Sequence, residues 1–312
     1  MFKFGFSSDN DENSEEIAKE LPEMIWKESN EIIIHTDSNP IKNGLGQINT
    51  KIVVSSGYEV KYLCSKAVIN TLLKNEQSLD DSVLKSEKNH SDLLPAVYEG
   101  GFKIWECTYD LLNYIDEQKI NFKEVNVLDL GCGAGIIGIT TLLCGAKCYF
   151  QDYNSDVIQY ITIPNVLLNS VSGMEKCKFY SGDWRSFSDL VEKALTTPED
   201  KFDYIFTSET IYNTECYPKL HRVFEKLLKK SGYMYLFQYN QQNEINCIWF
   251  PLLFMFLDIY YRYLAAKSFY FGVGGGITLF QDFLDEQKVF KYTTCWKCEE
   301  GVSREIIKIE FI

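Results

Sequence analysis

The glycine-rich stretch VNVLDLGCGAGIIG, residues 125–138, is the part of the sequence best suited to holding a nucleotide. Gly133, Gly135 and Gly138 have the spacing G-x-G-x-x-G, and Asp152 follows at about the distance of a ribose-binding acid. Glycine lacks the Cβ that would keep backbone amides away from a ligand, so such a turn can serve any nucleotide. Taken alone, the pattern also fits a nicotinamide cofactor.

Acidic residues after three successive predicted strands favour S-adenosylmethionine (SAM) instead. Asp129 stands beside the turn, where it would repel a pyrophosphate but could bind the cationic amino end of SAM, directly or through water. Asp152 can accept hydrogen bonds from both ribose hydroxyls, and Asp183, beside Trp184, is placed to accept from the adenine amino group. Each acid alone could equally be a helix cap. The three in this order, with the DxGxGxG turn, predict a SAM site.

Runs of strand length alternate with runs of helical apolar spacing from residue 93 onward. The run VNVLDL has the character of a buried parallel strand. In chain order we expect helices over 105–118, 136–144, 155–169 and 217–230, strands over 125–130, 147–153, 177–180, 202–209 and 232–237, and a terminal hairpin of 289–296 and 304–312. This alternation predicts an α/β fold with a parallel sheet whose ligand loops lie at the carboxyl ends of the strands.

Composition narrows the class of protein further. The chain has 312 residues, 46% of them hydrophobic, which is ample for a globular core, and a formal net charge of −13. No lysine- or arginine-rich run is present, so we expect no direct nucleic-acid specificity, whereas an acidic surface suits a basic protein substrate. No secretory signal is recognisable, and we read the ten cysteines as reduced thiols of an intracellular protein. The single CxxC, Cys295–Cys298, lacks a second pair at zinc spacing, so no metal site is expected.

Residues 92–312 resemble the histidine protein methyltransferases, class I SAM-dependent enzymes that methylate a histidine of a large-subunit ribosomal protein. The matching blocks are DLLPAVYEGGFKIWECTYDLL (92–112), VLDLGCGAGIIGI (127–139), FQDYNSDVI (150–158) with PNV (164–166), FYSGDW (179–184), TSETIYN (207–213) and YFGVGGGITLF (270–280). The opening FKFGF also resembles the start of the family, while the rest of the N-terminal third matches weakly.

The resemblance implies a seven-stranded, Rossmann-like class I sheet with helices on both faces, and it implies which residues hold SAM. Together with Asp129 and Gly133 of the turn, these are Ile104, Trp105, Glu106, Cys107, Thr108, Gly131, Gln151, Asp152, Tyr153, Gly182, Asp183, Trp184 and Ser208. Trp105 could also be a core anchor of its helix. The two roles are compatible, because an aromatic face near a sulfonium gains cation–π attraction.

The catalytic candidates Glu209, Tyr212 and Asn213 follow the fourth predicted strand. Glu209 and Tyr212 fit an acid-x-x-Tyr motif of related protein methyltransferases. A neutral imidazole is already a nucleophile near pH 7, so positioning should supply most of the rate. Glu209 could hold the opposite ring N–H and so fix the tautomer, or its carboxylate could instead be tied up in the adjoining turn.

The run Gly272–Gly276 is not followed by Lys-Ser/Thr, so it is not a P-loop. In the family's pattern it follows the fifth strand near the substrate entrance, and we interpret it as a flexible loop that faces the substrate.

Residues 237–264 depart from the family's spacing, because removing them joins GYMYL directly to AAKSFYFGVGGG. We interpret them as a lineage-specific insertion or as an intron read through in the gene model. A membrane anchor fits poorly, since the apolar part, 247–264, contains Pro251, Asp258 and Arg262 and is barely long enough to span a bilayer.

We therefore expect an acidic, partly disordered segment and linker over 1–92 and a SAM-dependent methyltransferase domain over 93–312. The expected activity is SAM-dependent methylation of a protein histidine, with a basic ribosomal protein as partner, no membrane association, a monomeric state, and a location in the cytoplasm and also the nucleus. Two alternatives are methylation of a protein lysine and a non-catalytic role as a SAM-binding assembly factor.

Overall fold

The computed structural model describes residues 26–34, 50–74, 96–169, 171–230, 261–268, 270, 274–298 and 302–312. Its strands are β1 (Asn30–Glu31), β2 (Thr50–Ser55), β3 (Tyr58–Leu63), β4 (Asn126–Leu130), β5 (Lys147–Asp152), β6 (Cys177–Ser181), β7 (Tyr204–Ser208), β8 (Tyr261–Lys267), β9 (Phe290–Cys298) and β10 (Arg304–Phe311). Its α-helices are α1 (Ser65–Lys74), α3 (Glu106–Gln118), α4 (Ile136–Leu143), α5 (Ser155–Val157), α6 (Ile163–Asn169), α7 (Trp184–Ala194), α8 (Tyr217–Leu227) and α9 (Ile277–Gln287).

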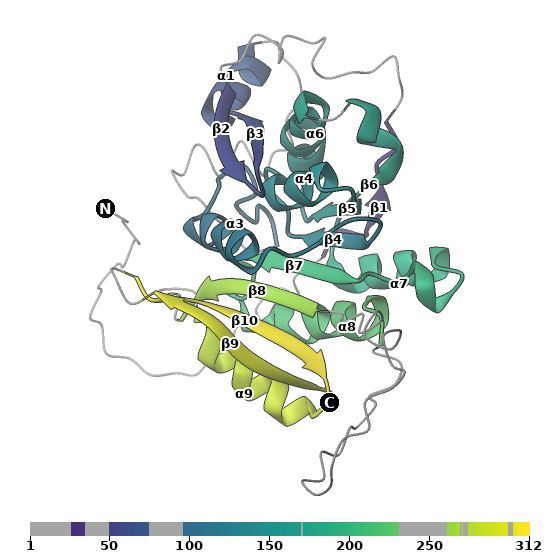
Figure 1. Ribbon diagram of the computed structural model, residues 1–312, viewed down its shortest axis with the longest axis vertical. Helices are drawn as coiled ribbons and strands as arrows, with labels where there is room; N and C mark the ends of the chain where they lie inside the picture. The colour runs from purple at the N-terminus through teal and green to yellow at the C-terminus, as the bar shows by residue number, and fades with distance from the viewer. Residues whose placement is uncertain are drawn as a thin grey trace, which may run out of the picture.

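A sheet of eight strands in the order β1-β6-β5-β4-β7-β8-β10-β9 forms the centre of the molecule (Figure 1). The five strands from β6 to β8 are parallel, and β10 runs antiparallel between β8 and β9. The predicted α/β class and the terminal hairpin are confirmed. The sheet has one strand more than the seven expected, because β1 adds to its edge. Helices α7 and α9 are additional to those predicted.

Side chains of the strands alternate between two cores, one on each face of the sheet. In β4, Val127 packs into the core beneath α3, α4 and α6, while Leu128 packs into the core beneath α7, α8 and α9. In β8, Tyr263 and Leu264 divide in the same way. A sheet covered on both faces explains why these strands read as continuous apolar runs in the sequence.

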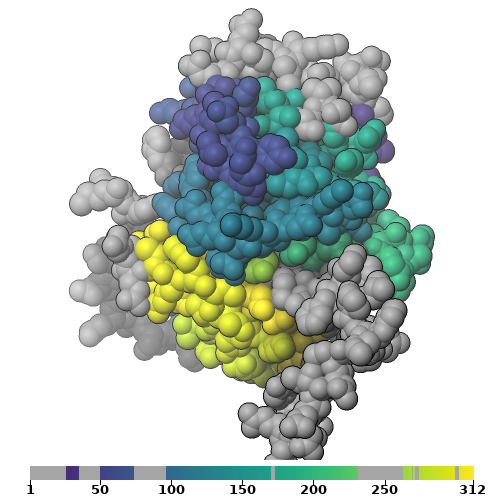
Figure 2. Space-filling model, viewed as in Figure 1, coloured from purple at the N-terminus to yellow at the C-terminus, as the bar shows by residue number. Residues whose placement is uncertain are grey.

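The described residues before residue 93 belong to the same fold. Strand β1 pairs with β6, and the β2–β3 hairpin with α1 packs onto the α4–α6 side, where Val60 and Leu72 join the first core. The Leu63 N–H donates to Asn165 Oδ1 at 2.8 Å. Figure 2 shows residues 50–74, in purple and dark blue, packed against the blue part of the chain that follows. Residues 26–34 and 50–74 therefore pack with the part of the chain that follows residue 93, whereas the other residues of 1–92 lie outside those described.

The fifth parallel strand lies later in the chain than predicted. The strand expected over 232–237 is outside the described residues, and β8 takes up Tyr261–Leu264, which the sequence analysis assigned to the insertion. The strand was predicted too early because the same pattern, Y-x-Y-L, occurs twice, at Tyr233–Leu236 and at Tyr261–Leu264. Removing residues 233–260 restores the family's spacing in the same way as removing residues 237–264. Within the described part of the chain, no helix has both the length and the apolar character to cross a bilayer.

We predict that Leu72→Ala lowers the free energy of unfolding by about 2–5 kcal/mol, because it leaves a cavity in the shared core. Leu72 is 1% exposed, whereas its neighbour Leu73 is 48% exposed. Leu73→Ala is thus the matched control and should change stability by no more than about 0.5 kcal/mol. Urea unfolding measures both, and equal effects of the two substitutions would show that α1 is not part of this core.

Candidate active site

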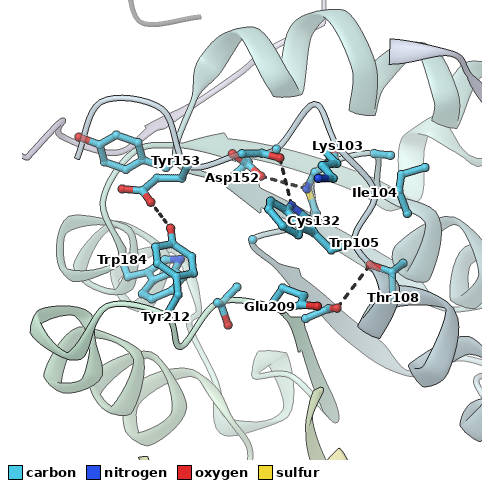
Figure 3. Close-up of a pocket in the computed structure, with 18 of the residues that line it drawn as sticks. Lys103, Ile104, Trp105, Thr108, Cys132, Asp152, Tyr153, Trp184, Glu209 and Tyr212 are labelled. Carbon is cyan, nitrogen blue, oxygen red and sulfur yellow. Dashed lines mark hydrogen bonds between the residues drawn. The ribbon is translucent and has the colours of Figure 1, made fainter. Parts of the chain in front are cut away.

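A cavity of about 800 Å³, counted with its open mouth, lies at the carboxyl ends of β4 to β7 (Figure 3). This is the edge where open α/β sheets bind their ligands. Its lining consists of Trp26, Glu99, Gly100, Gly101, Lys103, Ile104, Trp105, Thr108, Gly131, Cys132, Gly133, Ala134, Ile136, Asp152, Tyr153, Gly182, Asp183, Trp184, Ser208, Glu209, Thr210, Tyr212 and Cys216.

The glycine turn after β4 forms one wall of this cavity. Gly131 and Gly133 have φ angles of 67° and 50°, which side chains rarely adopt. A Cβ on Gly133 would lie 3.0 Å from the carbonyl oxygen of Gly101, so the two glycine loops approach each other backbone to backbone. Both predicted turn residues therefore line the cavity, and glycine is needed there for both conformation and space.

Asp129 has a different place from the one predicted. It is absent from the cavity lining, and its Oδ2 accepts a hydrogen bond from the Gly138 N–H of α4 at 2.8 Å. Complete burial raises the pKa of this carboxyl to about 7. Asp129 thus ties the start of α4 to the end of β4 rather than facing a ligand, and the predicted contact with the amino end of SAM finds no support in this geometry.

Asp152, at the end of β5, lies in the cavity wall as predicted. Its Oδ2 accepts from the Gly133 N–H at 2.9 Å and its Oδ1 from the Asn154 N–H at 3.2 Å. Burial raises the pKa of the carboxyl to about 6, although both backbone hydrogen bonds act in the opposite direction. The carboxylate is held rigidly, and each oxygen keeps a further lone pair that could accept from a ribose hydroxyl.

Asp183 lines the cavity but is also the N-cap of α7. Its Oδ2 accepts from the Arg185 N–H at 2.9 Å, and its Oδ1 accepts from Lys219 Nζ at 2.6 Å. The cap that the sequence left open as an alternative is therefore present in the structure. Trp184 lines the cavity and donates through Nε1 to Gln151 Oε1 at 2.9 Å. Gln151 is buried behind this wall and braces it.

The entry to α3 supplies Ile104, Trp105 and Thr108 to the lining. Trp105 donates through Nε1 to the Gly100 carbonyl at 3.3 Å, so its ring is fixed at the cavity. The predicted residues Glu106 and Cys107 are not part of the lining: the Glu106 side chain is 62% exposed, and Cys107 is fully buried. In a helix, successive side chains point in different directions, so five consecutive residues cannot all face one ligand.

Glu99 is a cavity residue that the sequence analysis did not single out. Its carboxylate accepts from the Ala96 N–H at 2.6 Å and, through Oε2, from the hydroxyl of the predicted residue Tyr212. Burial raises its pKa despite these hydrogen bonds. The signal available in the sequence was an acid directly before two glycines, in a block that matches the family.

Trp26 also lines the cavity and comes from the segment that leads into β1. Lys219 Nζ lies 3.1 Å from the centre of its ring, and the ring packs edge-on against Tyr153 at 6.0 Å. The Asp183 N–H donates to the Lys27 carbonyl at 2.8 Å, which fixes the segment beside the cavity. Nothing in the local sequence of Trp26 indicates this role, because its partners are more than a hundred residues away.

Glu209 follows β7 with a φ of 59°, an uncommon backbone conformation for a residue with a side chain. Its Oε2 accepts from the Tyr270 hydroxyl at 2.6 Å, while its buried Oε1 has no hydrogen-bond partner among the described residues. Lys267 Nζ lies 3.7 Å from that Oε1. The carboxylate is therefore not tied up in its own turn, and one oxygen is left to accept a hydrogen bond.

The last catalytic candidate, Asn213, is not in the lining, and its side chain accepts from the Glu215 N–H at 3.0 Å. It caps a short turn. The glycine run that follows β8 is described only from Gly274, and Gly275 is buried against the backbone of Ile211 and Tyr212, where any side chain would clash. That part of the run is a close packing contact and does not behave as an open loop.

Four carboxylates line the cavity, from Glu99, Asp152, Asp183 and Glu209, and Lys103 is the single lysine in the lining. Such a wall would repel a pyrophosphate and suits a ligand that carries positive charge. SAM, with its sulfonium and amino group, fits this set of carboxylates. Among the residues that the structure describes, no cluster of three or more His, Cys, Asp or Glu could hold a metal ion.

We predict that Trp26→Ala weakens SAM binding about tenfold, because an aromatic face against a nucleobase contributes about 1–3 kcal/mol. Ile33→Ala is the control, since Ile33 belongs to the same segment but is 70% exposed. Isothermal titration calorimetry compares the two. Unchanged affinity in the Trp26 variant would remove this residue from the binding site.

We further predict that SAM affinity declines as the pH falls below about 6. The ionised form of Asp152 accepts hydrogen bonds, and its pKa of about 6 means that protonation competes with binding there. Asp152→Asn should weaken binding about ten- to a hundredfold at pH 8 and should flatten the pH dependence between 5 and 7. Calorimetry across this range tests both statements; an unaltered pH profile in the variant would assign the titration to another group, such as Glu99.

Comparison with known proteins supports the resemblance read from the sequence. Residues 96–254 match a family model described as lysine methyltransferase. The histidine protein methyltransferase 1 homolog of Bos taurus is 40% identical, over 77% of this chain and 63% of that protein. The homolog of Mus musculus is 37% identical, over 92% of this chain and 75% of that protein. The more distant protein N-lysine methyltransferase METTL21A of Danio rerio is 27% identical over 40% of this chain and 54% of its own length.

The chain thus spans less than two thirds of the bovine relative's length, while most of its own length is matched. The matched residues include those that form the cavity, among them the glycine turn, Asp152 and the α3 entry. The chain belongs to the histidine protein methyltransferase family, a branch of the methyltransferases that use SAM as methyl donor.

Proposed function

We propose that this protein transfers a methyl group from SAM to a ring nitrogen of a protein histidine. The observation that carries the proposal is that Glu209 lines the cavity and that its buried Oε1 has no hydrogen-bond partner among the described residues. A neutral imidazole has an N–H on one nitrogen and a lone pair on the other. An N–H donated to Glu209 Oε1 would leave the lone pair of the other nitrogen directed into the cavity.

The chain's own residues bind, orient and move one proton. Asp152 and the turn of Gly131 and Gly133 would hold the nucleoside part of the cofactor, and Trp26 and Trp184 would screen it from water. SAM, when bound, supplies a methyl carbon that is activated by a positively charged sulfur. Methylation makes the imidazole cationic, so its N–H becomes acidic; Glu209 Oε1 takes that proton and passes it to solvent. Most of the rate comes from holding the nucleophile in line.

We further propose a basic, large-subunit ribosomal protein as the substrate. The support is the family resemblance together with the acidic balance of the chain, a net charge of −13, which favours association with a basic partner. The same proposal places the protein, as a monomer, in the cytoplasm and in the nucleus. It includes no recognition of nucleic acid and no membrane association.

Lysine methylation is the second candidate, and it is favoured by the description of the matched family model. An ammonium must lose its proton before it can attack, so the rate would depend more steeply on pH than with an imidazole. A non-catalytic role as a SAM-binding assembly factor is the third, and it would be favoured if the insertion over 237–264 is real and blocks the entrance.

The test is mass spectrometry of large-subunit ribosomal proteins from cells that lack this gene, before and after incubation with the purified protein and isotope-labelled SAM. The expected result is a new labelled methylhistidine. Label on lysine would establish the second candidate, and no label despite SAM binding would support the non-catalytic role.

We predict that Glu209→Gln lowers kcat for this substrate about a hundredfold or more, because the amide cannot take the imidazole proton. SAM affinity should be retained. Glu215→Gln, a substitution of an exposed glutamate in the same loop, serves as control and should leave kcat unchanged. Initial rates with labelled SAM provide the measurement, and a kcat for Glu209→Gln within about threefold of wild type would remove Glu209 from the reaction.

A further inference from the structure

Lys267 is the last residue of β8, and its side chain lies next to that of Glu209. Its Nζ lies 3.7 Å from Glu209 Oε1 and 3.7 Å from Glu106 Oε2, and its side chain is only 16% exposed. Both distances are longer than a hydrogen bond. The ammonium therefore compensates the charge of Glu209 and leaves the lone pairs of Oε1 unused.

The position of this ammonium is fixed on several sides. The rings of Trp105 and Tyr270 lie 5.1 and 5.7 Å from Nζ, within the range of cation–π attraction. Tyr270 also donates to the other oxygen of Glu209. The carboxylate is thus held through Oε2 by a neutral hydroxyl and faced at Oε1 by a cation that it does not bond.

Arg304 and Cys107 are two further titratable groups of this region. Arg304 of β10, which is opposite Lys267 in the strand register, forms an ion pair with Asp110 of α3 at 2.6 Å. Burial, and after it the charge of Glu209 and a hydrogen bond to that carboxylate, raise the pKa of the Cys107 thiol, so the thiol stays neutral. The charge of Lys267 is accordingly directed at Glu209, with the exposed Glu106 as its second neighbour.

We propose that Lys267 is a specificity-determining positioning residue, which makes the site accept a neutral imidazole and reject a cationic side chain. This inference rests on the proposed histidine methylation. Lys267 is not among the residues that line the cavity, so it acts through Glu209 and not by touching the substrate.

The physical reason is that like charges in a poorly hydrated site disfavour each other. A lysine substrate enters as an ammonium and would meet a carboxylate whose charge is already compensated. A neutral imidazole meets no such repulsion and can donate its N–H to Oε1. The same field disfavours a protonated imidazole, which lacks the lone pair needed for attack.

The experiment uses the full chain and two peptides. One surrounds the histidine that is labelled in the ribosomal protein test, and the other has lysine in its place. Lys267→Met removes the charge and keeps most of the stem. We expect the ratio of lysine to histidine methylation, each measured as kcat/KM, to rise at least about tenfold. Lys267→Arg keeps the charge and should restore the wild-type preference.

Lys308→Met is the matched control, because Lys308 is a similarly half-buried lysine on the adjacent strand β10, away from the cavity. SAM affinity measured by calorimetry shows that each variant is folded. If wild type labels the histidine peptide and Lys267→Met keeps the wild-type ratio, only this inference is overturned. If wild type labels no histidine at all, the proposed function fails and the inference fails with it.

Discussion

The burial of several carboxylates at one edge of the sheet is the constraint on which the rest of the site depends. A buried carboxylate is costly unless hydrogen bonds or an opposite charge compensate it. The fold meets this need with backbone amides for Asp152, a tyrosine hydroxyl and an amide for Glu99, and a lysine for Asp183. Among the residues that the structure describes, Glu209 alone of the four has a buried oxygen without a hydrogen bond. That incomplete satisfaction is the reason why our proposal assigns the substrate to Glu209.

The need to compensate these buried carboxylates also explains why the cavity wall contains residues from distant parts of the chain. The carboxyl ends of parallel strands meet at one edge, so Asp152 and Glu209 come together because β5 and β7 flank β4. The donors come from elsewhere: Lys219 from α8 and Tyr270 from the residues after β8. A change in any of these elements would leave a buried charge uncompensated, so the site and the stability of the fold are coupled.

Sequence reasoning predicted the features that depend on local geometry. The glycine turn, Asp152, Glu209 and part of the α3 entry lie at the cavity, because a strand followed by a turn determines where its last side chain lies. Their roles in binding and catalysis stay predictions. It could not place Trp26, whose role depends on contacts with Lys219 and Tyr153 far along the chain. Asp129 lies outside the cavity lining for a related reason: an acid beside a glycine turn can face either the ligand or the helix that follows, and its Oδ2 accepts from the Gly138 amide of that helix.

Strand β8 begins at Tyr261, within the insertion expected over 237–264, but the residues beside Glu209 come after that insertion. The sequence contains Y-x-Y-L twice, so the spacing alone could not decide which copy precedes Ala265. The structure uses the second copy, and pairing of Ala265 with Ser208 and of Lys267 with Arg304 fixes the register. Everything from Ala265 onward is common to both possibilities. The pairing of residues from Ala265 onward therefore places Lys267 and Tyr270 beside Glu209, whichever copy of the pattern precedes Ala265.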